Sequence, residues 1–173
     1  MDYNVRKDGS KSHKQEFYNH PELYCSSFME YAKQADIFIA GHYYSSGSPY
    51  LFTREDMKDK DFNLKVVADV SCDIDGPVAC TIRPSTIANP IYGYDKKTEQ
   101  EVDFNNEDAI AVMAVDNLPS ELPRDASEEF GSSVISEILP YLIDQDDGRI
   151  NRATTALNGK FCSKFTYLND FIN

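Results

Sequence analysis

Residues 64–90 read LKVVADVSCDIDGPVACTIRPSTIANP, and this stretch decides how we interpret the whole chain. It opens with an apolar run, 64–70, that is rich in β-branched residues and too short for a helix, which predicts a buried strand. The strand runs into polar residues before Gly76 and Pro77 turn the chain: Asp69, Ser71, Cys72, Asp73 and Asp75. Open α/β sheets place ligand sites just beyond the carboxyl ends of such strands. An ordinary solvated turn is the alternative, because Asp and Ser are common turn residues.

Two other apolar runs predict further buried strands. Residues 36–41 end at a glycine, and residues 109–115 lead into Asp116 and Asn117 before Pro119 stops the strand. Strands that alternate with helices form a parallel sheet with right-handed crossovers. The sequence therefore predicts an α/β fold with a mainly parallel sheet.

Helical periodicity marks the segments around these strands. Residues 21–35 predict a helix that begins at Pro21, a residue suited to the first helical turn. Pro123 begins the longest helix, and Pro140 should bend or weaken its last turns. Its apolar residues recur every four positions: Ala126, Phe130, Val134, Ile138 and Leu142.

Shorter patterns complete the chain. Residues 91–94 and 101–104 alternate around a turn at 95–98, which predicts a small β-hairpin excursion. Residues 151–157 and 161–172 predict two short terminal helices.

The loop at residues 42–49 is aromatic and flexible in composition. Tyr43 and Tyr44 could floor a flat ligand or simply cover the edge of the core, because tyrosine is commonly half-buried. A lone histidine such as His42 is more often a packed residue than a catalyst. Further on, Thr53 and Asp56 have the spacing of a helix N-cap followed by an acid three residues later.

Bulk composition excludes several classes of protein. The 173 residues suit one domain, and 41% apolar content argues against disorder. A net charge of −12 argues against nucleic-acid and anionic-membrane partners, because no basic surface is indicated. Four scattered cysteines and three histidines indicate no zinc site or disulfide framework. We find no signal-peptide pattern and no apolar run of about 20 residues, so we expect a soluble cytoplasmic protein.

Two ordered blocks resemble the saccharopine dehydrogenase, lysine-ketoglutarate reductase and alanine dehydrogenase superfamily. The first block is DVSCD at 69–73, RPST at 83–86 and PIY at 90–92, and the second is VDNLPSELPRDAS at 115–127. The resemblance covers roughly residues 15–145. It implies a partial Rossmann-like, three-layer domain and an NAD(P)-dependent amino-acid oxidoreductase that transfers a hydride at a C–N bond.

The resemblance also implies roles for individual residues. Asp73 and Asn117 would lie near the nicotinamide and the reacting carbon as catalytic residues. Four residues would line the cofactor: His42, Tyr43, Asp116 and Leu118. The alternative for Asp73 is that it only caps the turn before Gly76. No metal ligand is implied.

The sequence lacks the turn that holds the pyrophosphate in dinucleotide-binding domains. Its glycines lie at positions 9, 41, 47, 76, 93, 131, 148 and 159, so no G-x-G-x-x-G exists. The family's catalytic lysine and histidine have no counterpart either. We therefore expect residues 15–145 to be the carboxyl-terminal half of a dinucleotide-binding domain, preceded by a loosely ordered segment, 1–14, and followed by terminal helices, 146–173.

Two functions fit such a half-domain. It could be part of an NAD(P)-dependent oxidoreductase, binding NAD or NADP only when a complementary amino-terminal dehydrogenase chain completes it. It could instead be a non-catalytic, truncated dehydrogenase module that acts in protein association. Halving a sheet exposes a strand edge, so we expect a homodimer, formed by strand pairing or by exchange of the carboxyl-terminal helices.

Overall fold

The computed structural model describes residues 3–45 and 47–172. Met1, Asp2, Ser46 and Asn173 lie outside the described residues, and the predictions for segment 1–14, for the loop 42–49 and for the terminal segment 146–173 fall partly on them. The chain divides into two compact units, Met1–Glu121 and Leu122–Asn173, which we call the sheet unit and the helix unit. The predicted limits at 14/15 and 145/146 mark the part of the chain expected to resemble a dinucleotide-binding domain, and they stay predictions.

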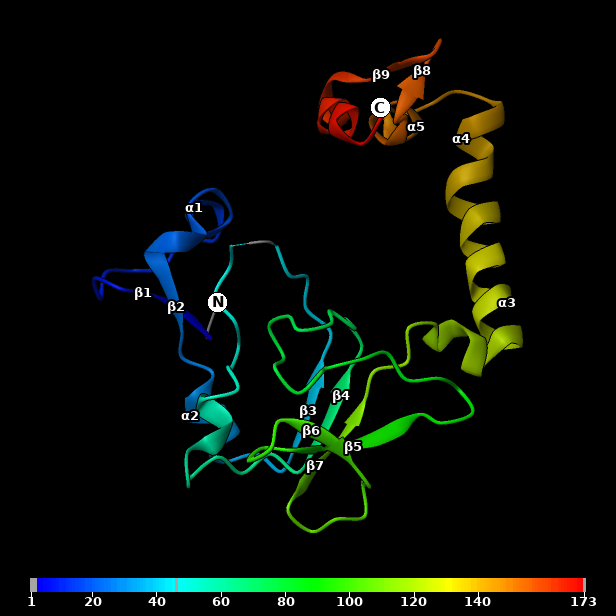
Figure 1. Cartoon of the computed structure of the whole chain (residues 1–173). Coiled ribbons are helices and arrows are strands. Elements are labelled where there is room, and N and C mark those ends of the chain that lie inside the picture. The colour runs from blue at the N-terminus through cyan, green and yellow to red at the C-terminus, as the bar shows by residue number, and fades with distance from the viewer. Residues whose placement is uncertain (1–2, 46, 173) are drawn as a thin grey trace. The chain divides into compact units, whose positions relative to one another are not determined.

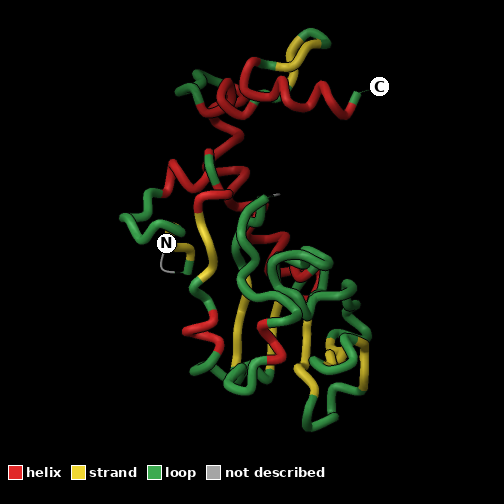
Figure 2. The backbone as a smooth tube through the Cα atoms, turned by 60° about the vertical axis from the view of Figure 1, so that its left-hand side comes forward, coloured by secondary structure: helices red, strands yellow, loops and turns green. Residues whose placement is uncertain are grey.

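A five-stranded sheet in the order β3-β4-β7-β5-β6 organises the sheet unit (Figures 1 and 2). Its parallel strands are β3 (Ile37–Ala40), β4 (Val66–Asp69) and β7 (Ala109–Met113). The predicted hairpin is confirmed as β5 (Ile91–Asp95) and β6 (Gln100–Val102), and β5 pairs with β7 antiparallel. The hairpin thus widens the sheet. The mainly parallel, partial Rossmann-like α/β fold is confirmed.

One face of the sheet packs into the hydrophobic core. Val67 and Val112 are fully buried on this face, under a layer of aromatic rings. The ring of Phe52 lies 5.9 Å from that of Phe28 and 5.4 Å from that of Phe62. Phe28 immediately precedes α2 (Met29–Ala32), and Phe52 and Phe62 lie in the chain between β3 and β4.

The opposite face of the sheet is apolar and open. Strand geometry puts alternate residues on opposite faces, and here the alternates are Ile37 and Ile39, which are 62% and 69% exposed, with Val66 and Ile91. The register aligns Ile37 with Val66 across β3 and β4. β3 is also an edge strand. β3 therefore has the position expected of a strand that loses its neighbour when a doubly wound sheet is halved.

The predicted helix at 21–35 is wrong for most of its length. Pro21–Leu23 forms one 3₁₀ turn, Tyr24–Ser26 forms β2, and only Met29–Ala32 is α-helical, as α2. β2 is held as a strand because it pairs antiparallel with β1 (Asn4–Arg6). Long-range pairing here overrides the local helical pattern.

Segment 1–14, expected to be loosely held, contains paired structure. Besides β1, the Arg6 guanidinium forms ion pairs with Asp8 and with Glu16 of α1 (Lys14–Asn19). The buried Tyr24 hydroxyl donates a hydrogen bond of 2.6 Å to Glu16. These contacts bring the first strand and helix together.

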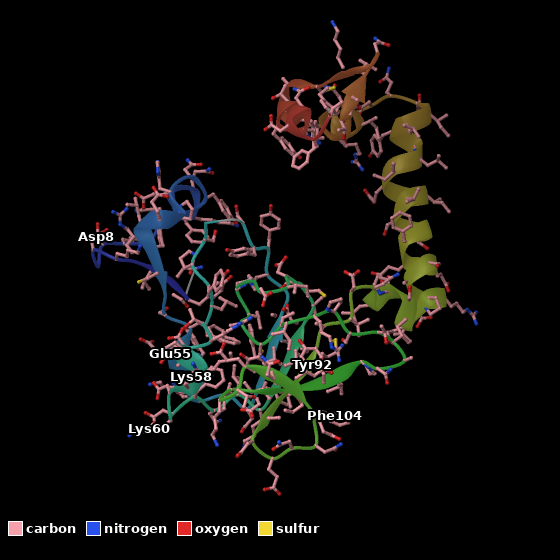
Figure 3. All side chains as sticks on the ribbon, viewed as in Figure 1. Asp8, Glu55, Lys58, Lys60, Tyr92 and Phe104 are labelled. Atoms are coloured by element: carbon pink, nitrogen blue, oxygen red, sulfur yellow. The ribbon has the colours of Figure 1, made fainter. Side chains whose placement is uncertain are left out.

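The predicted N-cap after the aromatic loop is confirmed. The Asp56 carboxylate accepts bonds from the Thr53 backbone N–H and hydroxyl, at 2.8 and 2.7 Å. The Thr53 hydroxyl oxygen in turn accepts the Asp56 N–H at 3.2 Å. This cap opens a 3₁₀ turn, Asp56–Lys58, which Figure 3 marks by Glu55 and Lys58.

The helix unit begins with the predicted long helix. α3 (Pro123–Ser133) continues through a π-helical stretch, Val134–Ile138, into α4 (Leu139–Ile143). The π stretch lies just before Pro140, because proline has no N–H for the carbonyl four residues back and the helix widens to pass it. Within this unit Ile138 and Leu142 are not buried: they are 42% and 61% exposed.

The end of the helix unit differs from the predicted pair of helices. α5 spans Arg149–Ala153, and a two-stranded hairpin, β8 (Ala156–Leu157) and β9 (Lys160–Phe161), follows it. The turn between the strands is Asn158-Gly159, both with left-handed backbone (φ 53° and 75°), the geometry that suits a tight hairpin. Ser163–Phe171 is a 3₁₀ helix. None of the described helices has the length and apolar content needed to cross a membrane.

Candidate functional site

The carboxyl ends of the three parallel strands lie at the same end of the sheet. This carboxyl edge, as distinct from the edge strand β3, holds the candidate site. Ala40 of β3 lies opposite Asp69 of β4, and Ala68 lies opposite Met113 of β7. Beyond the last pair, the Val70 N–H still donates to the Ala40 carbonyl at 2.8 Å. The loops that follow the three strands therefore leave the sheet side by side.

Asp69 anchors the loop after β4 with its buried carboxylate. Its Oδ1 accepts bonds from the Ser71 N–H and hydroxyl and from the Cys72 N–H, at 3.1, 2.5 and 3.2 Å. Its Oδ2 accepts the Thr81 hydroxyl at 2.6 Å. A buried carboxylate needs such donors, because an unpaired one would be strongly destabilising. The clamp fixes the path of the chain to Asp73.

The main chain closes the turn after Asp73. The Gly76 N–H donates to the Asp73 carbonyl at 3.0 Å. A Cβ at position 76 would lie 2.7 Å from that carbonyl oxygen, so the close approach requires glycine. Asp73 therefore takes part in the turn through its carbonyl, and both its catalytic role and the alternative that it only caps the turn before Gly76 stay predictions.

The charge of Asp116 acts on Cys72 in the loop after β4, and the charge of Asp73 acts on Tyr44 in the loop after β3. Burial raises the pKa of the Cys72 thiol, and the nearby charges of Asp116, Asp69 and Asp73 raise it further. Burial likewise raises the pKa of the Tyr44 hydroxyl, with smaller contributions from Tyr50 and Asp73. The Cys72 thiol donates to the Ala114 carbonyl at 3.2 Å and so links the ends of β4 and β7.

The remaining predicted residues follow β3 and β7. Asn117 is exposed, and its carbonyl accepts the Ser120 N–H at 3.1 Å, which opens the 3₁₀ turn Leu118–Glu121. Tyr43 is 88% exposed, whereas both ring nitrogens of His42 are buried without a hydrogen-bond partner. The fold thus brings the three loops to one edge; the catalytic and cofactor-binding roles of these residues stay predictions.

Sequence reasoning missed two buried residues that hold the site together. Besides Thr81, the Ser85 hydroxyl accepts the Ala114 N–H at 2.9 Å, and the Ser85 N–H donates to the Ala114 carbonyl at 2.8 Å. Ser85 belongs to the RPST motif, so that motif clamps the end of β7. The sequence signal for them is that Thr81 and Ser85, two small hydroxyl residues, lie close to Pro84 of this motif.

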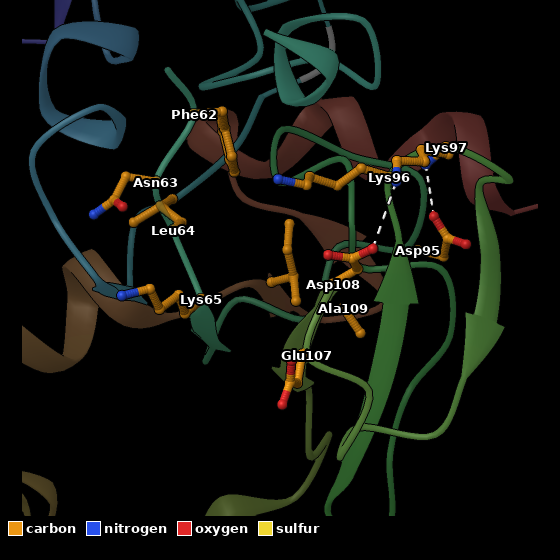
Figure 4. A pocket seen from close by; sticks show the side chains of 11 residues that line it. Phe62, Asn63, Leu64, Lys65, Asp95, Lys96, Lys97, Glu107, Asp108 and Ala109 are labelled. Carbon is orange, nitrogen blue, oxygen red and sulfur yellow. Dashed lines mark hydrogen bonds and ion pairs between the residues drawn. The ribbon is translucent and has the colours of Figure 1, made fainter. Parts of the chain in front are cut away.

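A cavity of about 240 Å³ lies at the amino-terminal ends of β4 and β7, opposite the candidate site (Figure 4). Its lysines are engaged: Lys97 pairs with Asp108 at 3.5 Å, and Lys96 lies over the Phe62 ring at 5.7 Å. Sheets of this kind bind ligands at the carboxyl ends of their strands, so this cavity is separate from the candidate site. Among residues 3–45 and 47–172, no cluster of three or more His, Cys, Asp or Glu side chains could hold a metal ion.

Residues 3–164 match the family model described as alanine dehydrogenase/PNT, C-terminal domain. The chain belongs to this family. The match includes both blocks on which the sequence resemblance rests, at 69–92 and 115–127. The resemblance to the saccharopine and alanine dehydrogenase superfamily is confirmed.

Named relatives agree with this assignment. The chain is 27% identical over 172 residues to alpha-aminoadipic semialdehyde synthase of Arabidopsis thaliana, across 94% of this chain and 16% of that protein. It is 31% identical over 125 residues to the NAD(+), L-lysine-forming saccharopine dehydrogenase of Emericella nidulans, across 71% and 32%. Mitochondrial alpha-aminoadipic semialdehyde synthase of Bos taurus is 26% identical, across 95% and 21%. The chain therefore spans 16% to 32% of the length of these relatives.

Proposed function

We propose that this chain forms the nicotinamide-side half of the cofactor domain in an NAD(P)-dependent amino-acid oxidoreductase. The reaction would be of the saccharopine, lysine-ketoglutarate or alanine dehydrogenase type. The observation that carries the proposal is the convergence of the loops after β3, β4 and β7 at one sheet edge, in a chain of this family. The relatives' names supply the reaction class, which comes to this chain only as part of the proposal.

The cofactor fits this edge in part. The family implies a nicotinamide-cofactor domain, and open, polar strand ends suit the ring and its ribose. A wall of His42, Tyr43, Asp116 and Leu118 would hold that end. The pyrophosphate needs backbone N–H groups converging at a glycine-rich turn, which the sequence lacks. The other half of the cofactor would therefore be held by another part of the assembled enzyme.

Asp73 and Asn117 would do the chemistry of this half. When bound, the nicotinamide supplies or accepts a hydride at the C–N bond of the substrate. The Asp73 carboxylate would orient the substrate amine or hold a proton for a neighbouring group. The Asn117 amide, exposed beyond β7, would donate and accept hydrogen bonds at the reacting carbon's substituents.

The second candidate is a non-catalytic module that acts in association. Two features of β3 support this candidate. It is an edge strand of the sheet, and Ile37 and Ile39 on its open face are largely exposed. An apolar strand with unpaired backbone groups pairs readily with another chain. We propose a homodimer through this edge, or assembly with a complementary amino-terminal dehydrogenase chain.

A chimera distinguishes the two functions. The matching segment of the Emericella nidulans saccharopine dehydrogenase is replaced by this chain, and NAD-dependent turnover is measured. The catalytic proposal expects turnover, and expects Asp73→Asn in the chimera to lower it about 100-fold or more. The exposed Asp61→Asn is the matched control, with no expected effect. A folded chimera without turnover favours the association module, and Asp73→Asn within about twofold of the unmutated chimera contradicts the role of Asp73.

The isolated chain should bind dinucleotides poorly. Calorimetry with NADH and NADPH should show no binding tighter than about 1 mM, because the pyrophosphate site is missing. Micromolar binding contradicts the half-domain proposal.

The cytoplasmic location is also a proposal. The bovine relative carries the word mitochondrial in its name. Cell fractionation with antibodies to this chain tests the location, and recovery with mitochondria contradicts it.

A further inference from the structure

Another cavity, of about 390 Å³, lies between the amino-terminal elements and the aromatic loop after β3. Residues of β1 and α1 form one wall, and residues 42–45 with Ser48, Pro49 and Leu51 form the other. The volume is within the range of small-molecule sites. This cavity belongs to the sheet unit alone.

Two side chains that line this cavity have buried polar atoms without partners. Asn4 is 6% exposed and its Oδ1 has no hydrogen bond, although its backbone is paired in β1. His42 has no partner at Nδ1 or at Nε2. Leaving a buried polar group unpaired costs about 1–3 kcal/mol, so such groups are rare unless a bound species satisfies them. Two residues that line this cavity therefore carry three polar atoms without partners, which indicates a polar ligand.

The other lining groups define what that ligand is like. Phe17, Tyr18 and Tyr43 supply aromatic surface, which favours a flat ring by stacking. Lys14 is the charged residue among the described lining residues, and its ammonium lies 5.9 Å from the Tyr18 ring centre. In a chain of net charge −12, a cavity lined by a cation and no carboxylate selects for an anion.

We propose that this cavity binds a planar aromatic carboxylate that carries a ring N–H. The ring lies against the aromatic wall, the N–H donates to Asn4 Oδ1, and the carboxylate pairs with Lys14 and accepts a hydrogen bond from His42. The orphaned atoms have almost no surface open to solvent, so lining side chains shift when the ligand enters. The site shares His42 and Tyr43 with the wall proposed above for the cofactor, and its binding is tested in the chain alone.

Three matched probes test the proposal. Indole-3-acetate has the ring N–H and the carboxylate, benzothiophene-3-acetate replaces the N–H by sulfur, and indole-3-acetamide removes the charge. The chain has no tryptophan, so the fluorescence anisotropy of the two indoles reports their binding directly. Calorimetry measures all three probes. We expect indole-3-acetate to bind with Kd below about 1 mM, and the benzothiophene to bind about tenfold more weakly.

Variants locate the binding. Lys14→Gln should weaken indole-3-acetate about fivefold and leave indole-3-acetamide unchanged, whereas Lys11→Gln, three residues earlier and also exposed, should change neither. Tyr43→Ala, at an exposed position that leaves the fold intact, should weaken both indoles. Failure of indole-3-acetate to bind below about 1 mM overturns the proposal, and so does equal affinity for the benzothiophene or an unchanged affinity in Lys14→Gln. NADH binding and chimera turnover are measured separately, so either proposal can fail without the other.

Discussion

The two faces of the central sheet carry similar amounts of apolar side chain and yet have opposite surroundings. Val67, on one face of β4, is fully buried beneath Phe52 and its neighbours. Val66, the preceding residue, points to the other face and is 39% exposed beside Ile37. Alternation along a strand normally separates an apolar side from a polar one, whereas here both sides are apolar.

That difference shows what kind of molecule this is. Parallel sheets are covered on both faces, and their strands read as continuous apolar runs. The strands of this chain keep that composition, but only one covering layer is present in the sheet unit. The sequence thus encodes a sandwich of which the sheet unit supplies two layers. The four predictions that follow test the comparison, beginning with the largest expected effect.

Phe52→Ala should cause the largest loss of stability. Phe52 is fully buried and its ring contacts those of Phe28, Phe38 and Phe62, so truncation leaves a cavity under the covered face. We expect the free energy of unfolding to fall by about 3–5 kcal/mol. Urea denaturation measures it, with Phe104→Ala, at a 47% exposed position, as the control. Equal losses for the two variants would show that the ring layer is not the core.

Val67→Ala and Val66→Ala compare the faces at adjacent positions. Removing the buried Val67 methyl groups should cost about 2–3 kcal/mol, and removing those of the half-exposed Val66 less than about 1 kcal/mol. Chemical denaturation of both variants gives the difference directly. A cost for Val66→Ala as large as that for Val67→Ala contradicts an open face.

Much of this architecture could be predicted from the sequence. The strands at 36–41, 64–70 and 109–115 combine β-branched runs with polar or glycine ends, and the structure has a strand in each. The capping pair Thr53 and Asp56 was also predictable, because its spacing alone defines the hydrogen bonds.

Other features depend on contacts that no local pattern reveals. The segment 24–26 looked helical, and only pairing with β1 makes it a strand. Asp69 was grouped with the polar residues of the site, but its burial and its bond to Thr81, twelve residues later, make it a structural anchor. The hairpin at Asn158-Gly159 is different, because that dipeptide is itself a strong local turn signal.

Alkaline pH should destabilise the covered face through Tyr92, which projects from β5 (Figure 3). Burial raises the pKa of Tyr92 to about 12 from an ordinary value of 10.0. The unfolded chain therefore loses this proton first, and stability present below pH 10.0 is lost as the pH rises to about 12. We expect a loss of about 1–2 kcal/mol in that window.

Tyr92→Phe should remove that part of the pH dependence. It also removes the hydrogen bonds to the Cys80 carbonyl and from the Ile82 N–H, so its stability at neutral pH falls by about 1 kcal/mol. Denaturation curves between pH 9 and about 12 compare the two proteins. An unchanged slope in Tyr92→Phe would assign the alkaline transition to other groups.

The association state of the chain tests the central claim, which is that the open face and the edge strand β3 of the sheet bind a partner chain. Light scattering at micromolar concentration should report twice the chain mass of 19.6 kDa. Ile39→Asp, which puts a charge on the 69% exposed position of edge strand β3, should return the mass to that of one chain, while Leu157→Asp in the helix unit should not. A clean wild-type monomer of 19.6 kDa, with no tendency to associate, contradicts the account.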